Sequence, residues 1–100
     1  MPKLIIQLMN EEWTVELQVG SNVLGRASTC GVPLKDPSLS RQHCDIVFVG
    51  GHATVVDKGS LNGTLVNGRK VSEHALQPGD KIVIGASTIW YEKKNVAVEK

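Results

Sequence analysis

Apolar and polar residues alternate in parts of this chain with the period of two that is typical of half-buried β-strands. The longest alternation covers residues 13–19, where Trp, Val, Leu and Val are separated by Thr, Glu and Gln. An apolar stretch at residues 4–8 precedes it, and Asn10-Glu11-Glu12 lies between the two. We therefore predict a hairpin over residues 3–19, with its turn at residues 10–12.

Residues with turn chemistry divide the rest of the chain into further short strands. Asn67-Gly68 is the strongest signal of a two-residue hairpin turn in the sequence, and Gly50-Gly51-His52 marks another. Pro33 and Pro37 argue against a helix in the irregular stretch before residue 43. The further predicted strands, in chain order, are residues 22–25, 31–34, 43–49, 53–57, 64–66, 69–71, 81–84 and 86–91. About ten short strands without a helix predict an all-β sandwich or barrel.

The composition restricts the class of protein. A chain of 100 residues with 41% apolar and 21% charged residues is expected to form one soluble globular domain. With only 4% aromatic residues, the core must be built from Val, Ile and Leu. The net charge of +1 supplies no overall field for nucleic acid or an anionic membrane, so any affinity for anions must come from a local cluster. Residues 95–100 are charged and lose the periodicity, so we expect a domain over residues 1–94 and then a charged tail or the start of a linker.

The cysteines and the apolar runs bear on location. Cys30 and Cys44 belong neither to a Cys-x-x-Cys pair nor to a set with zinc-ligand spacing, so no metal site is predicted. Two free thiols favour a reducing compartment. We expect Cys44 in the core and Cys30 exposed in a loop. No apolar run approaches the ~20 residues of a membrane span, and the N-terminal one is too short for a secretory leader. A cytoplasmic location is the expectation.

Three polar segments fall where loops are predicted: Gly25-Arg26, Ser40-Arg41-Gln42-His43 and Ser60-Leu61-Asn62-Gly63-Thr64. Together they supply two guanidinium groups, hydroxyls and an amide. Guanidinium forks match the oxygens of a phosphate ester, and hydroxyls add directional donors. Because no metal ligands and no nucleophile–base pair with a recognisable motif accompany them, these residues predict a docking site rather than a reaction site.

The order and spacing of these motifs carry a family resemblance. Gly-Arg, then Ser-x-x-His, then Asn-Gly-Thr before a Val-Asn-Gly turn resembles the forkhead-associated domain over essentially the whole chain. The resemblance implies an eleven-stranded β-sandwich of two twisted sheets with the binding loops at one end. It also implies a non-catalytic module without a cofactor, which binds phosphothreonine-containing proteins or peptides downstream of a Ser/Thr protein kinase.

The resemblance further implies roles for individual residues. Arg26 would contact the phosphate through its guanidinium fork, Ser40 would donate its hydroxyl, and Arg41 would add a second positive contact. Asn62 would bond the peptide backbone beside the phosphorylated residue. Asn67 would line the same groove, although the chemistry of Asn67-Gly68 itself favours a turn role for this residue.

Leu61 departs from the family pattern, because several members have a hydroxyl residue immediately before the Asn. Only the Leu61 backbone N–H would then serve at this position. The other motif residues are implied to have structural roles: a tight backbone, a hydrogen bond that braces the loops, and a turn. These residues are Gly25, His43, Gly63 and Thr64.

Two other functions remain as alternatives. Leu61 leaves open a phosphate-independent protein–protein interaction or self-association module that uses a sheet face. An enzyme would take Ser40, His43 and Asp57 as nucleophile, base and orienting group, but no nucleophile-elbow motif surrounds the serine. Nucleic-acid binding is disfavoured, because neither a basic stripe nor paired aromatic residues occur.

Overall fold

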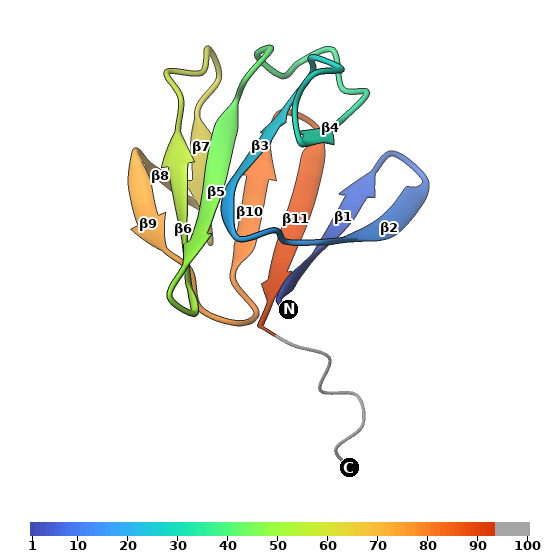
Figure 1. Ribbon diagram of the computed structural model, residues 1–100. Coiled ribbons are helices and arrows are strands. Elements are labelled where there is room, and N and C mark those ends of the chain that lie inside the picture. The colour runs from blue at the N-terminus through green and yellow to red at the C-terminus, as the bar shows by residue number, and fades with distance from the viewer. Residues whose placement is uncertain (94–100) are drawn as a thin grey trace.

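The computed structural model of this chain describes residues 1–93, which form two β-sheets and no helix (Figure 1). The strands are β1 (Lys3–Leu8), β2 (Glu11–Glu16), β3 (Gly20–Gly25), β4 (Val32–Pro33), β5 (Cys44–Val49), β6 (His52–Asp57), β7 (Thr64–Val66), β8 (Arg69–Val71), β9 (Glu73–Ala75), β10 (Lys81–Ile84) and β11 (Ser87–Glu92). One sheet has the order β2-β1-β11-β10-β7-β8 and the other β4-β3-β5-β6-β9. The expected eleven-stranded sandwich is confirmed, while the predicted tail at residues 95–100 lies outside the described residues.

Turn chemistry positions two hairpins as the sequence predicts. Gly50 and Gly51 join β5 to β6 with φ of 62° and 79°. Asn67 and Gly68 join β7 to β8 with φ of 52° and 85°. Positive φ at both central residues is the type I′ geometry, whose twist matches that of the flanking strands.

The structure corrects the first hairpin and adds a strand. Its turn is formed by Met9 and Asn10, not by residues 10–12, and β2 ends at Glu16. Beyond that point Leu17 is buried and its N–H donates to the Pro2 carbonyl at 2.9 Å, whereas Val19 is 73% exposed. The alternation therefore continues in sequence after the pairing with β1 has ended. Strand β9, which pairs with β6, was not predicted.

The core lies between the two sheets and is mainly aliphatic, as the scarcity of aromatic residues required. Its fully buried members include Leu4, Ile6, Leu24, Ile46, Val55, Ile82, Ile84 and Ile89. Cys44 is buried among them as expected. The expectation for Cys30 was wrong: this side chain is 8% exposed, and its thiol donates to the Arg41 carbonyl at 3.1 Å.

Two further side chains have defined places in the fold. His74 is on β9, is partly buried, and its Nε2 atom lies 3.5 Å from Asp80 Oδ2. Trp13 packs against the edge of the core. Among residues 1–93, every buried side-chain nitrogen or oxygen has a hydrogen-bond partner.

The topology places several loops at one end of the sandwich. The connections after β4, β6 and β10 lie at the upper end in Figure 1, and the N-terminus lies at the lower end. Residues far apart in sequence therefore meet at the upper end. Within the described part of the chain, no helix has the length and apolar character needed to cross a membrane.

The environment of Cys44 leads to a test of the packing. Burial raises the pKa of this thiol to about 12, and the nearby charges of Asp57 and Asp45 act in the same direction. Since the thiolate is the reactive form, native Cys44 should resist alkylation by iodoacetamide at about pH 8 and react fully in guanidinium chloride. Peptide mass spectrometry measures both states. Alkylation at equal rates in the native and denatured protein would contradict the packing described here.

Candidate functional site

The upper end of the sandwich contains a hollow of about 440 Å³ between the β4–β5 loop and the β6–β7 loop. Its lining residues come from three segments of the chain: Arg26, Pro37, Ser38, Leu39, Ser40, Arg41, Leu61 and Asn62. Five residues with expected binding roles are among them. No carboxylate lines the hollow among the described residues, so its charged groups are both positive.

The backbone of Gly25 packs directly against the loop that carries Ser40 and Arg41. A Cβ at Gly25 would lie 2.2 Å from the Arg41 carbonyl oxygen, so no larger residue fits without a shift of backbone. The Arg26 N–H donates to the Ser40 carbonyl and the Ala27 N–H to the Arg41 carbonyl, each at 3.1 Å. These bonds fix the end of β3 beside the loop and place Arg26 at the hollow.

Arg26 is anchored through only part of its guanidinium. Its Nε donates to the Leu39 carbonyl at 3.1 Å. The two terminal nitrogens of the fork donate to no protein acceptor among the described residues, and they are the pair that matches two oxygens of one anion. Arg41 is exposed and lines the same hollow.

His43 is fully buried and joins the two loops. Its Nδ1 accepts the Ser40 N–H at 3.2 Å, and its Nε2 lies 2.7 Å from the Gly63 carbonyl oxygen. Because Nδ1 accepts, the proton belongs on Nε2, which therefore donates to Gly63. The neutral ring thus holds the β4–β5 loop against the β6–β7 loop.

Ser40 and Leu61 form a second link between the loops. The Leu61 N–H donates to Ser40 Oγ at 3.0 Å. The sequence predicted that this N–H would bind the ligand, but in the structure it is already bonded. This hydrogen bond orients the Ser40 oxygen and leaves the Ser40 hydroxyl proton available to an acceptor in the hollow. The Leu61 side chain is 87% exposed beside it.

Asp57, the last residue of β6, holds the β6–β7 loop in a compact turn. Its Oδ1 accepts from Ser60 Oγ at 2.6 Å and from Thr64 Oγ1 at 2.7 Å, and its Oδ2 accepts the Ser60 N–H at 3.1 Å. Burial alone would raise the pKa of Asp57, but the hydrogen bonds from Ser60 and Thr64 outweigh it, and the pKa lies below its ordinary value.

Asp36 holds the β4–β5 loop in a similar way. Its Oδ1 accepts from Ser38 N–H at 3.0 Å and Ser38 Oγ at 2.5 Å. Its Oδ2 accepts from Ala86 N–H and Ser87 Oγ, each at 2.9 Å. Burial opposes ionisation, yet these bonds lower the pKa of Asp36. One carboxylate therefore joins this loop to the β10–β11 turn.

Asn62 separates the hollow from a second one of about 380 Å³. The Asn62 Nδ2 donates to the Ser38 carbonyl at 2.9 Å and so connects the two loops at their tips. The second hollow is lined by Ser38, Asn62, Gly63, Leu65, Val83, Gly85 and Ala86. Ser38 and Asn62 line both hollows, so the two hollows lie next to each other at the loop tips.

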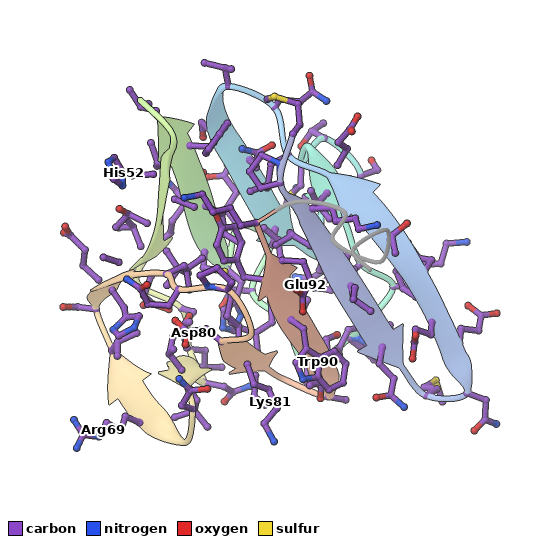
Figure 2. The ribbon with its side chains drawn as sticks, turned by 90° about the horizontal axis from the view of Figure 1, so that it is seen from below. His52, Arg69, Asp80, Lys81, Trp90 and Glu92 are labelled. Carbon is purple, nitrogen blue, oxygen red and sulfur yellow. The ribbon has the colours of Figure 1, made fainter. Side chains whose placement is uncertain are left out.

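The structure does not place Asn67 among the residues that line either hollow. Its Nδ2 donates to Asp80 Oδ1 at 2.9 Å, and its Oδ1 accepts the Lys81 N–H at 3.0 Å. Figure 2, which views the molecule from below, shows Asp80 and Lys81 near the viewer, away from the loops that form the hollow. Asn67 therefore has the role of a turn residue that ties the β7–β8 hairpin to β10.

The residues of the hypothetical catalytic triad do not form a relay. His43 bonds the backbone of Ser40 rather than its hydroxyl, and its other nitrogen is taken by Gly63. The Asp57 carboxylate accepts from Ser60 and Thr64 instead of orienting the ring. No group of three or more His, Cys, Asp or Glu side chains within residues 1–93 is arranged to hold a metal ion.

Sequence reasoning missed the two carboxylates that shape the loops. A local signal for both carboxylates was present in the sequence, because an Asp followed two or three residues later by a Ser is a pattern in which the carboxylate accepts a hydrogen bond from a nearby backbone N–H group. The two instances are Asp36-Pro37-Ser38 and Asp57 followed by Ser60. It also missed Lys70, whose side chain lies over Gly63. That contact depends on the register of the β7–β8 hairpin and has no local signal.

Comparison with known proteins gives a match across most of the chain. A family model described as "FHA domain" matches residues 22–85. FhaA from Mycobacterium tuberculosis is 41% identical over 76 residues, which are 76% of this chain and 14% of that protein. The glycogen accumulation regulator GarA from Mycolicibacterium smegmatis is 43% identical over 61 residues, which are 61% of this chain and 39% of that protein. The chain thus spans only a minor part of these relatives.

Solved structures agree in fold. The FHA domain of FhaA, in complex with the intracellular domain of Rv3910, has a TM-score of 0.87 and 35% identity over 92% of this chain and 100% of that one. A second structure, from a study of "phosphothreonine-dependent FHA domain interactions", has a TM-score of 0.82 and 36% identity over 90% of this chain and 95% of that one.

The lowered pKa of Asp57 leads to a pH test. A carboxyl whose folded pKa lies below its unfolded value, about 3.9, stabilises the fold above that value and loses this contribution as pH falls through the folded pKa. Asp57→Asn should therefore cost roughly 1–3 kcal/mol at neutral pH. Between about pH 5 and pH 3 the variant should lose less stability than the parent. Thermal unfolding followed by circular dichroism measures both, and parallel acid curves would exclude this role for Asp57.

Asn67 offers a test that separates a turn residue from a ligand-binding one. Asn67→Ala loses two hydrogen bonds and leaves a side chain at positive φ, so it should cost about 1–3 kcal/mol of stability. Asn67→Gly restores the backbone freedom and should recover part of this loss. Urea denaturation measures the stability. Neither variant should bind a phosphothreonine peptide less tightly, and a clear loss of affinity at full stability would return Asn67 to the site.

Proposed function

The chain belongs to the FHA domain family, and on that premise we propose that it is a phosphothreonine-dependent peptide-recognition module of Ser/Thr kinase signalling, without catalytic activity. The observation that carries the proposal is the hollow between the loops, where two guanidinium groups and the Ser40 hydroxyl face one space that no carboxylate of residues 1–93 lines. A phosphothreonine side chain brings about −1.5 to −2 charges and three acceptor oxygens at neutral pH. The donors and the ligand are complementary in charge and in hydrogen-bonding capacity.

Each lining residue has a distinct part in this proposal. The terminal nitrogens of Arg26 bind two phosphate oxygens, Ser40 donates its hydroxyl to the same group, and Arg41 adds a second positive charge. Asn62, which keeps its Oδ1 and one N–H unused among the described contacts, bonds the peptide backbone beside the phosphothreonine. Gly25, His43, Gly63 and Thr64 support these residues through the backbone and loop contacts described above.

The expected strength suits reversible recognition. Hydrogen bonds to charged groups contribute roughly 1.5–3 kcal/mol each, so about three of them correspond to an affinity near the micromolar range. A Ser/Thr kinase supplies the modified partner, and a phosphatase that removes the phosphate ends the interaction. We place this activity in the cytoplasm, since Cys30 and Cys44 are both free thiols.

A second candidate is phosphate-independent association with a protein partner or another copy of the chain. The exposed Leu61 side chain supports it, because an apolar group at this position adds nothing to phosphate binding. Titration with unphosphorylated peptide and sedimentation of the free protein discriminate this candidate from the first.

Removal of the Arg26 fork tests the proposed function. Arg26→Ala should reduce affinity for a phosphothreonine peptide by roughly 100-fold or more, because at least two charge-assisted hydrogen bonds are lost. Stability should change by about 1 kcal/mol or less, as only the bond to the Leu39 carbonyl is removed. Arg26→Lys keeps the charge without the fork and should bind with intermediate affinity.

Arg69→Ala is the matched control for this series. It removes the same charge from an exposed position on β8 that does not line the hollow. Isothermal titration calorimetry against phosphorylated and unphosphorylated forms of one peptide measures all four proteins. Equal affinity of the parent for both forms would refute the proposed function.

A further inference from the structure

Lys70, which lies outside the two loops, brings a positive charge close to Gly63 and Leu65, two residues that line the second hollow. It lies on β8 opposite Leu65 of β7. Its side chain lies over Gly63: a Cβ at Gly63 would be 2.8 Å from Lys70 Cε and 3.5 Å from Lys70 Nζ. Because Gly63 has no side chain, the Lys70 stem packs on its backbone, and the ammonium group lies beside the loop that carries Asn62.

The second hollow has apolar walls. Leu65 and Val83 pair across β7 and β10 and project from the outside of the six-stranded sheet, where both are partly exposed. Ala86 adds a methyl group from the β10–β11 turn. This surface suits the methylene groups of a side chain, while Lys70 at its margin suits a negative charge at the end of that side chain.

The walls are held in place before any ligand binds. A Cβ at Gly85 would lie 2.4 Å from Ser38 Oγ, so the β10–β11 turn is in close contact with the β4–β5 loop. Asp36 accepts hydrogen bonds from Ser38 on one side and from Ala86 on the other. A preformed pocket costs little ordering entropy on binding.

No described carboxylate neutralises Lys70. The one ion pair found among residues 1–93 joins His74 to Asp80, and no Asp or Glu lines the second hollow. The ammonium group of Lys70, which is an exposed residue, is therefore available to a ligand that continues from the first hollow past Asn62 into the second.

We propose that Lys70 is a specificity-determining residue that binds a carboxylate side chain of the phosphothreonine partner, with Glu preferred to Asp. The longer stem of Glu places two methylene groups against Leu65 and Val83 while its carboxylate reaches Lys70. An extended peptide advances about 3.3 Å per residue, so the acidic residue lies a few positions from the phosphothreonine. This inference rests on the proposed function, because the phosphate fixes the peptide in the first hollow.

A peptide scan tests the proposal. The parent peptide contains one phosphothreonine among alanines, and single Glu residues replace alanine at about one to four positions on either side. Glu at one of these positions should strengthen binding by about two- to fivefold, which is the range for exposed ion pairs. Gln at the same position should give no such gain. The gain should shrink at high salt, because exposed charges are screened. Fluorescence anisotropy with labelled peptides measures the affinities.

Variants of the protein assign the gain to Lys70. Lys70→Ala should abolish the preference for Glu and retain affinity for the all-alanine phosphopeptide. Lys70→Glu should reverse it, so that a Lys at the same peptide position is preferred. Arg69→Ala is the control, since Arg69 is the neighbouring cation on β8, projects at the lower left of Figure 2 and lines neither hollow.

The outcomes separate this inference from the function on which it rests. A phosphopeptide that binds normally but gains nothing from Glu at any position, or a gain that persists in Lys70→Ala, overturns the role of Lys70. A second phosphothreonine that strengthens binding where Glu does not would overturn the choice of a carboxylate. Equal binding of the phosphorylated and unphosphorylated parent peptides would instead refute the proposed function itself.

Discussion

The two hydrogen bonds of the buried His43 ring are the interaction on which the binding end of this sandwich depends. They join the Ser40 N–H to the Gly63 carbonyl, two backbone groups that are 23 residues apart in sequence and belong to loops without regular pairing. A buried polar group without a partner costs roughly 1–3 kcal/mol, so the ring favours only arrangements in which both loops lie against it. The position of the loop with Ser40 relative to the loop with Leu61 and Asn62 depends on this contact.

The loops are further stabilised by groups that do not face the ligand. Asp57 and Asp36 each accept hydrogen bonds from neighbouring hydroxyl and N–H donors, and each keeps its negative charge outside the set of residues that line the first hollow. Arg26 is held through Nε, and Ser40 Oγ is held by the Leu61 N–H. In each case the anchoring contact uses one part of the group and leaves another part for an anion. This arrangement preorganises the donors, which lowers the entropic cost of binding.

The success of sequence reasoning depended on whether the signal was local. The β5–β6 and β7–β8 turns were predicted correctly because glycine and asparagine tolerate positive φ at those positions. Strand β9 was missed, since Glu73-His74-Ala75 has no apolar alternation and is a strand only through its pairing with β6. Cys30 was placed wrongly because its burial depends on the Arg41 carbonyl, eleven residues away.

The same distinction applies to the site. The spacing of Gly25-Arg26, Ser40 and Asn62 predicted which residues would meet, because the family resemblance contains long-range information that periodicity lacks. It did not predict that the Leu61 N–H is already bonded, or that Asn67 is held by Asp80 and Lys81. Those outcomes depend on competition among neighbouring polar groups, which the types of residue alone do not decide.

A net charge of +1 is compatible with anion recognition because charge is distributed locally. Arg26 and Arg41 face a hollow that no carboxylate lines within the described chain, and Lys70 lies over Gly63 at the margin of a second one. The electrostatic field of these three side chains extends over about a Debye length, roughly 8 Å at physiological salt. It therefore favours anionic ligands at the loops without attracting anions to the rest of the surface. Selectivity for a phosphorylated partner therefore does not require a protein with a large positive net charge. It requires a fold that places a few cationic side chains together at the binding loops, while the carboxylates that stabilise those loops do not line the first hollow.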